Sequence, residues 1–248
     1  MCRIRRMHWM ILMLVLLCPR KSATKEFGDQ ESCRSPLVAE GEEDVLVSVS
    51  VSEEEAGGLQ SIWGAVQGHV DRIHLYVAAG VSIPQLPSGF GGCIEVFKEG
   101  AHEVGAASDG SWKGFQIVME DTIEYPIGYI EVATSVVEAY SRDVIVAYDG
   151  AVWNELDLKN PVLVSTGGVR EAVMLDTWVD VLRLGTVVFH AHALRGKSPE
   201  EDWRVGRFLP VLTGLEDVRW AAAVHHAGVA RLVAYHEQGW LQEISRKD

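Results

Sequence analysis

The sequence predicts an α/β domain whose sheet is mainly parallel and is flanked by helices on both faces. Strand-like apolar runs alternate with segments of helical periodicity, and the first of these runs carries no charge, as expected for a strand buried on both faces. No internal repeat and no linker divides the chain after residue 43. With 248 residues, 48% of them hydrophobic, the chain can form one sizeable core.

The predicted elements follow one another from Asp44 onward. Residues 44–52 are expected to form a buried strand, and the acids at 53–55 open a helix whose apolar stripe recurs at helical spacing. Pro126 sits where a second helix can begin. Further strands are predicted over 72–80, 93–97, 114–120, 143–150 and 230–240, with one or two strands bent at Gly185 within 179–194, a polar segment to Gly168 and a helix over 216–227.

The first 43 residues are expected to lie outside the domain, which then covers 44–248. An apolar run from Trp9 to Cys18 follows basic residues, but it is shorter than the roughly 20 residues that span a bilayer, so no transmembrane span is predicted. Pro19, Arg20 and Lys21 stand where a signal peptide needs small neutral residues. A cytoplasmic location is therefore favoured, with secretion or membrane association left open. Residues 22–43 are polar and acidic and are predicted to be a disordered tail.

The overall charge excludes one class of function. A formal net charge of -13 argues against a nucleic-acid partner, because non-specific binders of nucleic acid need a basic face. Anionic ligands remain possible, since a local cation can reverse the field at one site. The four cysteines show no metal-ligand spacing, and three of them precede Asp44, so a disulfide framework is not expected.

The strongest candidate for chemistry is the acid pair Glu120 and Asp121, which ends an uncharged strand. Such carboxylates must be solvated, paired or bound to a cation. Ligands of open α/β sheets bind beyond the carboxyl ends of the strands. The pair could hold Mg²⁺ or Mn²⁺ that neutralises a diphosphate, or it could be a solvated helix cap before Pro126. Phosphate-loop, dinucleotide-binding and nucleophile-elbow motifs are absent from the sequence.

Four short strings, taken in order, resemble bacterial-type glycosyltransferases of family 2 with the GT-A fold. VSVSVSEEEAGGLQSIWGAVQGHVDRIHLYV (47–77) is similar to the opening strand, helix and second strand of that family. MEDTIEYPIGYIE (119–131) resembles its D-D-D-I-x-Y-P-x-x-Y segment, and LGTVVFHAHAL (184–194) resembles its G-T-x-x-F-H-x-x-x-L strand. LEDVRWAAAVHHAGV (215–229) resembles its late helix. Together these strings cover most of the chain after Asp44.

The resemblance implies an inverting transfer of a sugar from a nucleotide-diphosphate donor to a saccharide or other hydroxyl acceptor, assisted by Mn²⁺ or Mg²⁺. Glu120 and Asp121 take the first two acidic places and would hold the metal, whereas Thr122 stands where the third acid belongs. Asp217 matches the late acid and would be the general base. Val49 and Ser50 would face the nucleotide, and Gly185, Thr186 and His190 would lie on the substrate side.

Several alternatives stay open. The Thr122 departure favours a non-catalytic relative that binds a sugar, a nucleotide or a partner protein, and a metal-dependent nucleotidyl- or phosphoryl-transfer enzyme is a second rival. His190 and His192, two apart on a strand, could bind zinc from one face. The tryptophans at 203, 220 and 240 could stack on sugar rings or fill the core, and the glycines of 165–169 could turn a loop over a ligand.

Overall fold

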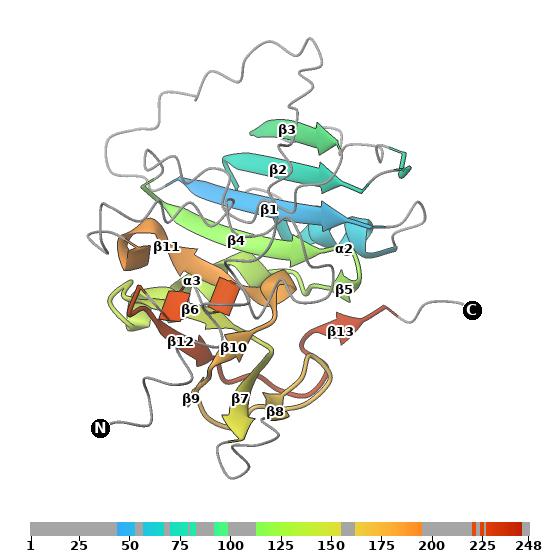
Figure 1. The fold of residues 1–248 in the computed structure, drawn as a ribbon. Coiled ribbons are helices and arrows are strands. Elements are labelled where there is room, and N and C mark those ends of the chain that lie inside the picture. The colour runs from blue at the N-terminus through green and yellow to red at the C-terminus, as the bar shows by residue number, and fades with distance from the viewer. Residues whose placement is uncertain are drawn as a thin grey trace, which may run out of the picture.

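A computed structural model describes the protein over residues 44–52, 57–66, 70–78, 80–82, 92–98, 113–154, 162–194, 220–221, 224–225 and 227–244. Its largest element is an eight-stranded sheet in the order β3-β2-β1-β4-β11-β6-β12-β9 (Figure 1). The neighbours β1 (Val45–Val51), β2 (Arg72–Val77), β3 (Cys93–Lys98) and β4 (Phe115–Glu120) run parallel. The predicted α/β class with a mainly parallel sheet is confirmed.

One strand in the middle of the sheet runs against its neighbours. β11 (Val188–His190) is antiparallel to both β4 and β6 (Val144–Ala147), so β4 and β6 point the same way. β12 (Ala230–Val233) is parallel to β6, and the short β9 (Thr177–Trp178) closes that edge antiparallel to β12. The strands β1, β2, β3, β4, β6 and β12 therefore end at one edge of the sheet, which we call the carboxyl edge.

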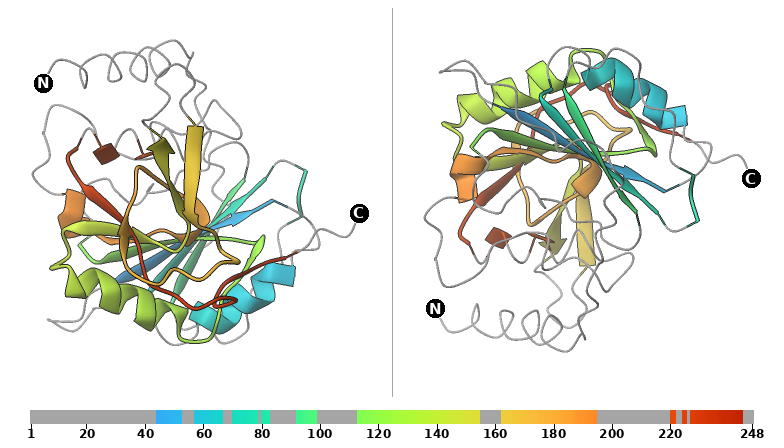
Figure 2. Two further views of the ribbon diagram at one scale, coloured as in Figure 1. Left: turned by 90° about the horizontal axis from the view of Figure 1, so that it is seen from below. Right: turned by 90° about the horizontal axis from the view of Figure 1, so that it is seen from above.

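The two helices α2 (Gly57–Val66) and α3 (Tyr129–Ala139) lie on one face of the sheet, as both views in Figure 2 show. The apolar stripes that predicted these helices are buried against alternate residues of β1 and β4, such as Val47 and Ile117. Helix α3 begins three residues after Pro126, because Gly128 adopts a left-handed conformation (φ 83°) that changes the direction of the chain before the helix. The strand residues that face the two helices form, with the apolar stripes of the helices, what we call the first core.

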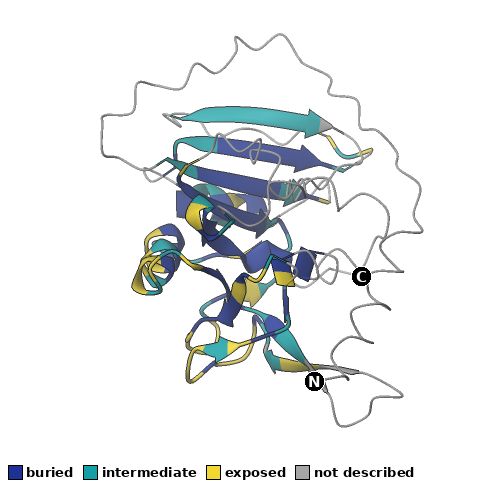
Figure 3. Ribbon diagram, turned by 60° about the vertical axis from the view of Figure 1, so that its left-hand side comes forward, coloured by how far each residue is buried: buried dark blue, intermediate teal, exposed yellow. Residues whose placement is uncertain are grey.

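A second core lies on the opposite face. Val118 and Ile145, which alternate with the first-core residues, pack there with Phe189 and the fully buried Trp220. Trp220, Ala221, Val224 and His225 are helical, within the helix predicted over 216–227. The strands nearest the centre of the sheet are accordingly buried along almost their whole length (Figure 3).

The segment that the sequence predicts only as polar contains an antiparallel hairpin. β7 (Gly150–Asn154) pairs with β8 (Val162–Gly167), and β10 (Val181–Leu182) adds to β7. The hairpin projects from the sheet on the side away from the helices (Figure 2). A side chain at Gly150 would lie 2.8 Å from the carbonyl oxygen of Val181, so this crossing of strands needs glycine. The expected bend at Gly185 is present as the 3-10 turn η1 (Leu184–Thr186), followed after β11 by η2 (Ala191–Leu194).

A small sheet joins the end of the described chain to the acid pair. β5 (Ile123–Glu124), directly after Thr122, pairs antiparallel with β13 (Gln242–Glu243), and the Ile244 N–H donates to the Thr122 carbonyl at 2.9 Å. Neither two-residue strand was predicted, because a pair this short leaves no periodic pattern. It places Glu243 beside the carboxyl edge.

Two further findings bear on the sequence predictions. Cys93, the first residue of β3, is disulfide-bonded, although its sequence spacing predicted no disulfide framework. Cysteine spacing does not reveal which sulfur atoms meet after folding.

Among the described residues, no helix has both the length and the apolar character needed to cross a membrane.

Candidate functional site

The acid pair at the end of β4 is held by the protein's own donors. Asp121 is buried, with 4% of its surface exposed. Its Oδ2 accepts a hydrogen bond from the Ser52 N–H at 2.7 Å, and its Oδ1 accepts one from the Ser52 hydroxyl at 2.9 Å. Ser52 follows β1, the strand beside β4. Asp121 is therefore neither a solvated acid nor a helix cap: it fastens the carboxyl ends of two adjacent strands.

The Glu120 carboxylate contacts Thr122 and Arg183 instead of Ser52. The Thr122 hydroxyl donates to Glu120 Oε2 at 3.3 Å, and Arg183 Nη2 lies 3.7 Å from the same oxygen. The backbone N–H of Glu120 donates to the Tyr125 hydroxyl, which in turn donates to the Gly185 carbonyl. A side chain at Gly185 would lie 2.5 Å from the Glu120 carboxyl carbon. Glycine at 185 thus leaves the space that Glu120 occupies.

Arg183 is the centre of the site, and nothing in the sequence patterns singled it out. Its Nη1 lies 3.5 Å from Asp149 Oδ2 and 2.5 Å from Glu243 Oε1, in addition to the contact with Glu120. Arg170 Nη2 reaches the other oxygen of Glu243 at 3.2 Å. These five residues form what we call the arginine cluster, in which three carboxylates face two guanidinium groups. Its members come from distant parts of the chain, so no local motif could reveal it.

The environment shifts two carboxyl groups of the cluster in opposite directions. Burial raises the pKa of Asp149, although the charge and hydrogen bonding of Arg183 and the Val169 backbone N–H partly offset it. The hydrogen bond from Arg183 lowers the pKa of Glu243, with further help from the charge of Arg170. The two arginines therefore favour the charged form of Glu243.

The predicted substrate residues Gly185 and Thr186 lie at the carboxyl edge but are buried. The Thr186 hydroxyl donates to the Arg183 carbonyl at 3.0 Å and accepts from the Tyr148 N–H at 3.2 Å. The Tyr129 hydroxyl donates to the Thr186 carbonyl at 3.3 Å. Gly185 and Thr186 are therefore buried structural residues of the turn that follows Arg183.

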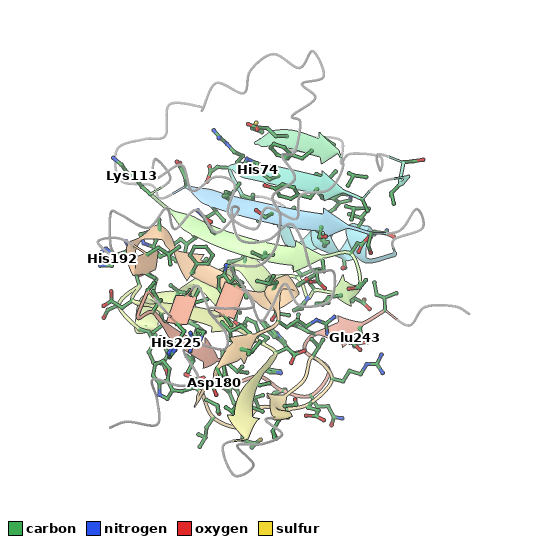
Figure 4. All side chains as sticks on the ribbon, viewed as in Figure 1. His74, Lys113, Asp180, His192, His225 and Glu243 are labelled. Atoms are coloured by element: carbon green, nitrogen blue, oxygen red, sulfur yellow. The ribbon has the colours of Figure 1, made fainter. Side chains whose placement is uncertain are left out.

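The structure does not bring His190 to this edge. Because β11 is antiparallel, His190 pairs with Phe115, the first residue of β4, and its ring packs edge-on against that phenyl ring at 5.0 Å. Its neighbour His192 lies at the amino edge in Figure 4, on the side opposite Glu243. Val49 is buried in the first core, whereas Ser50 faces the other side of the sheet next to Glu120. Asp217 lies outside the described residues.

The structure also places most of the residues of the alternative sites, which are the histidine pair, the tryptophans and the glycines of 165–169. The strand ends at His190, and Nδ1 of that ring accepts from the His192 backbone N–H at 3.0 Å, so the two imidazoles do not share one strand face as the zinc hypothesis required. Trp220 fills the second core, Trp240 packs on Tyr148 with ring centroids 4.4 Å apart, and Trp203 lies outside the described residues. The glycines of 165–169 end β8 and form the turn that carries Arg170.

A divalent cation is the cofactor that the sequence resemblance implies. Both oxygens of Asp121 already accept hydrogen bonds from Ser52, and Glu120 is turned toward Arg183. Within the described part of the chain, no group of three or more histidine, cysteine, aspartate or glutamate side chains is arranged to hold a metal ion. Both carboxylates are thus engaged by groups of the protein itself, and binding of Mg²⁺ or Mn²⁺ by Glu120 and Asp121 stays a prediction.

Replacing Asp121 with asparagine separates the two roles. If Asp121 joins β1 to β4, Asp121→Asn should lower the free energy of unfolding by about 1–3 kcal/mol. The asparagine NH₂ group would replace one of the two oxygens that accept from Ser52, and a donor would then face a donor. Ser52→Ala, which keeps the backbone donor, should cost less. Urea unfolding monitored by circular dichroism measures both. An Asp121→Asn protein as stable as wild type, but without Mn²⁺-dependent nucleotide binding, would instead favour the metal role.

A second prediction concerns Tyr148, which is fully buried in an aromatic cluster with Tyr129, His236 and Trp240. Among the described residues its hydroxyl has no hydrogen-bond partner. Tyr148→Phe is expected to raise the free energy of unfolding by about 1–3 kcal/mol, because it removes a buried polar group that costs desolvation. Tyr125→Phe is the matched control and should be destabilising, since that hydroxyl makes two hydrogen bonds. A loss of stability in Tyr148→Phe would contradict the prediction.

The fold and site define an α/β protein with a charged cluster at the carboxyl edge of a mainly parallel sheet. No family model matches the sequence, and no curated protein matches it. Among solved structures, the chain is similar to the crystal structure of 2-C-methyl-D-erythritol 4-phosphate cytidylyltransferase from Thermus thermophilus, with a TM-score of 0.43 and 11% identity over 80% of this chain and 92% of that one. Similarity at this level does not indicate what this chain binds.

Proposed function

We propose that this chain is a transferase that binds a nucleotide-diphosphate-linked sugar at the carboxyl edge and passes the sugar to a hydroxyl acceptor. The observation that supports it is the meeting of four segments at the edge where open α/β sheets bind ligands: Ser52 contacts Asp121, and the adjacent Glu120 and Asp149 both contact Arg183. The order of the strings that resemble the glycosyltransferase family supports the sugar donor. Arg183 offers guanidinium donors of the kind that bind phosphate groups.

The proposed transfer needs one carboxylate besides the donor site. The acceptor hydroxyl loses its proton to Asp217 while its oxygen bonds to the anomeric carbon of the donor sugar. The bond from that carbon to the diphosphate oxygen breaks on the opposite face, and the nucleoside diphosphate leaves with the electron pair. Asp217 has this role through the resemblance alone.

Binding of a nucleoside diphosphate tests the proposal. Isothermal titration of the full chain with UDP and with GDP, once in EDTA and once in Mn²⁺, should show saturable binding of one of them. Binding that appears only with Mn²⁺ would support the predicted cation at Glu120 and Asp121. If neither nucleotide binds under either condition, the proposal fails.

A non-catalytic relative is the second candidate, and a specific observation favours it. The acids of the segment that resembles D-D-D serve the protein's own structure, since Asp121 binds Ser52 and Thr122 donates to Glu120. Such a protein would bind a nucleotide or sugar without releasing product. Incubation with UDP- and GDP-sugars separates the two, because a transferase releases nucleoside diphosphate when the sugar passes to an acceptor or to water. Release of pyrophosphate from a triphosphate would instead identify nucleotidyl transfer.

A further inference from the structure

Glu243 lies between two arginines at the carboxyl edge. Its Oε1 accepts a hydrogen bond from Arg183 Nη1, and its Oε2 lies 3.2 Å from Arg170 Nη2. Guanidinium groups bind carboxylates and phosphates through the same planar donors. A carboxylate whose two oxygens are shared between two guanidiniums therefore occupies a place suited to a phosphate or diphosphate group.

Asp149, which follows the end of β6 by two residues, contacts Arg183 and the backbone next to Arg170. The Arg183 N–H donates to the Asp149 carbonyl at 3.0 Å, and the Asp149 carboxylate is hydrogen-bonded to the Val169 backbone. Next to Val169, the turn carrying Arg170 is closed by the Glu171 N–H, which donates to the Gly168 carbonyl at 2.9 Å. The backbone at both arginines is thus held by hydrogen bonds, so binding an anion does not require that backbone to be ordered first.

Glu243 has weaker support than the arginines it bridges. Its strand β13 has two residues and pairs only with the two residues of β5 within the described chain. The Glu243 side chain is 36% exposed and that of Arg170 is 63% exposed, so an anion from solvent can reach the pair without opening the core. A short surface strand of this kind can detach at low free-energy cost.

We propose that Arg170 and Arg183 form the site for the diphosphate of the donor, and that Glu243 competes with the diphosphate for it. This rests on the proposed function, because it assigns the donor's charged part to the same edge. With Glu243 in place, three carboxylates face two guanidiniums, so the cluster has a net negative charge that disfavours binding of a dianion. When Glu243 is displaced or neutral, the opposing charges become equal. The two guanidiniums can then donate hydrogen bonds to the diphosphate in the place of Glu243.

Inorganic pyrophosphate is the probe for the competing carboxylate. Calorimetric titration in EDTA should show that Glu243→Gln binds pyrophosphate about tenfold or more tightly than wild type, since it keeps the shape and removes the competing charge. Glu237→Gln is the matched control: it removes one exposed carboxylate from the same segment, and no described ion pair involves it. Equal affinity of the two variants for pyrophosphate would overturn the proposal.

The arginines are tested by a separate substitution that leaves the core untouched. Arg170→Gln should weaken pyrophosphate binding about tenfold in both the wild-type and the Glu243→Gln background. Arg142→Gln is the control, because Arg142 pairs with Glu138 at the end of α3 and its guanidinium lies over Phe115, at the start of β4. If Arg170→Gln and Arg142→Gln reduce the affinity equally, the site is not between Arg170 and Arg183. Thermal melts confirm that each variant is folded.

UDP and GDP titrations of the same variants separate this inference from the proposed function. Pyrophosphate binding that responds to Glu243 and Arg170, without binding of either nucleotide, would retain the anion site and reject the nucleotide donor. Nucleotide binding that does not respond to either substitution would retain the proposed function and overturn this inference. Parallel responses of pyrophosphate and nucleotide would support both.

Discussion

Replacing Gly114 with alanine should lower the free energy of unfolding by about 3 kcal/mol or more. A Cβ at this position would lie 1.7 Å from the carbonyl oxygen of Asp44. That oxygen accepts the hydrogen bond from the Phe115 N–H at 2.9 Å, where the pairing of β1 with β4 begins. Because the clash is with backbone, no change of side-chain rotamer can relieve it, and the two central strands would have to separate.

Gly64→Ala is the matched control for this substitution. Gly64 lies inside α2, and a Cβ there would meet nothing within 4 Å. Alanine should therefore raise the stability by about 0.5–1 kcal/mol through its helix propensity. Urea unfolding of both variants gives the comparison. A Gly114→Ala protein with wild-type stability would show that β1 and β4 do not approach each other as closely as described.

The largest expected effect on activity comes from Asp217→Asn. If Asp217 is the general base of the proposed transfer, turnover should fall by about 10²–10⁴-fold while affinity for the donor stays near that of wild type. The helical residues that follow it in the sequence are well anchored: Trp220 is fully buried, and the Ala221 carbonyl accepts from Arg231 Nη1 at 3.1 Å. A loss of the Asp217 charge need not disturb these contacts.

The alternative role of Asp217 predicts a different result. As a helix-dipole partner it would contribute about 0.3–1 kcal/mol to stability, and Asp217→Asn would leave turnover unchanged. Glu216→Gln is the control, since it removes the neighbouring acid and should affect only stability. Steady-state kinetics and thermal melts of both variants distinguish the roles. A wild-type protein that binds donor without transferring or hydrolysing it would favour the non-catalytic candidate.

The main elements were predictable because each carries its burial pattern locally. The uncharged runs of β1, β4 and β6 and the apolar stripes of α2 and α3 are short-range patterns set by the strand and helix periods. The class of fold follows from their alternation. The position of Glu120 and Asp121 at a strand end, and hence at the carboxyl edge, could be predicted in the same way.

Neither the direction of β11 nor the β7–β8 hairpin was predictable in this way. A run such as Val188–His190 has the same composition whichever way it pairs, and its antiparallel direction is what moves His190 to the edge opposite Glu120. In the hairpin, Val164 and Ser165 are exposed, so β8 lacks the apolar alternation that identifies a strand. Strand order and direction depend on packing between distant segments.

The sequence by itself determined the α/β class, the central strands, both helices of the first face and the acid pair at a strand end. Only the tertiary structure decided the partners of those acids: Asp121 binds Ser52, 69 positions away, and Glu120 faces Arg183. Arg183 in turn meets Glu243, 60 positions further on. Burial leaves a periodic trace along the chain because neighbouring residues share one strand or helix. An ion pair leaves none, since it depends only on where two remote side chains meet in space.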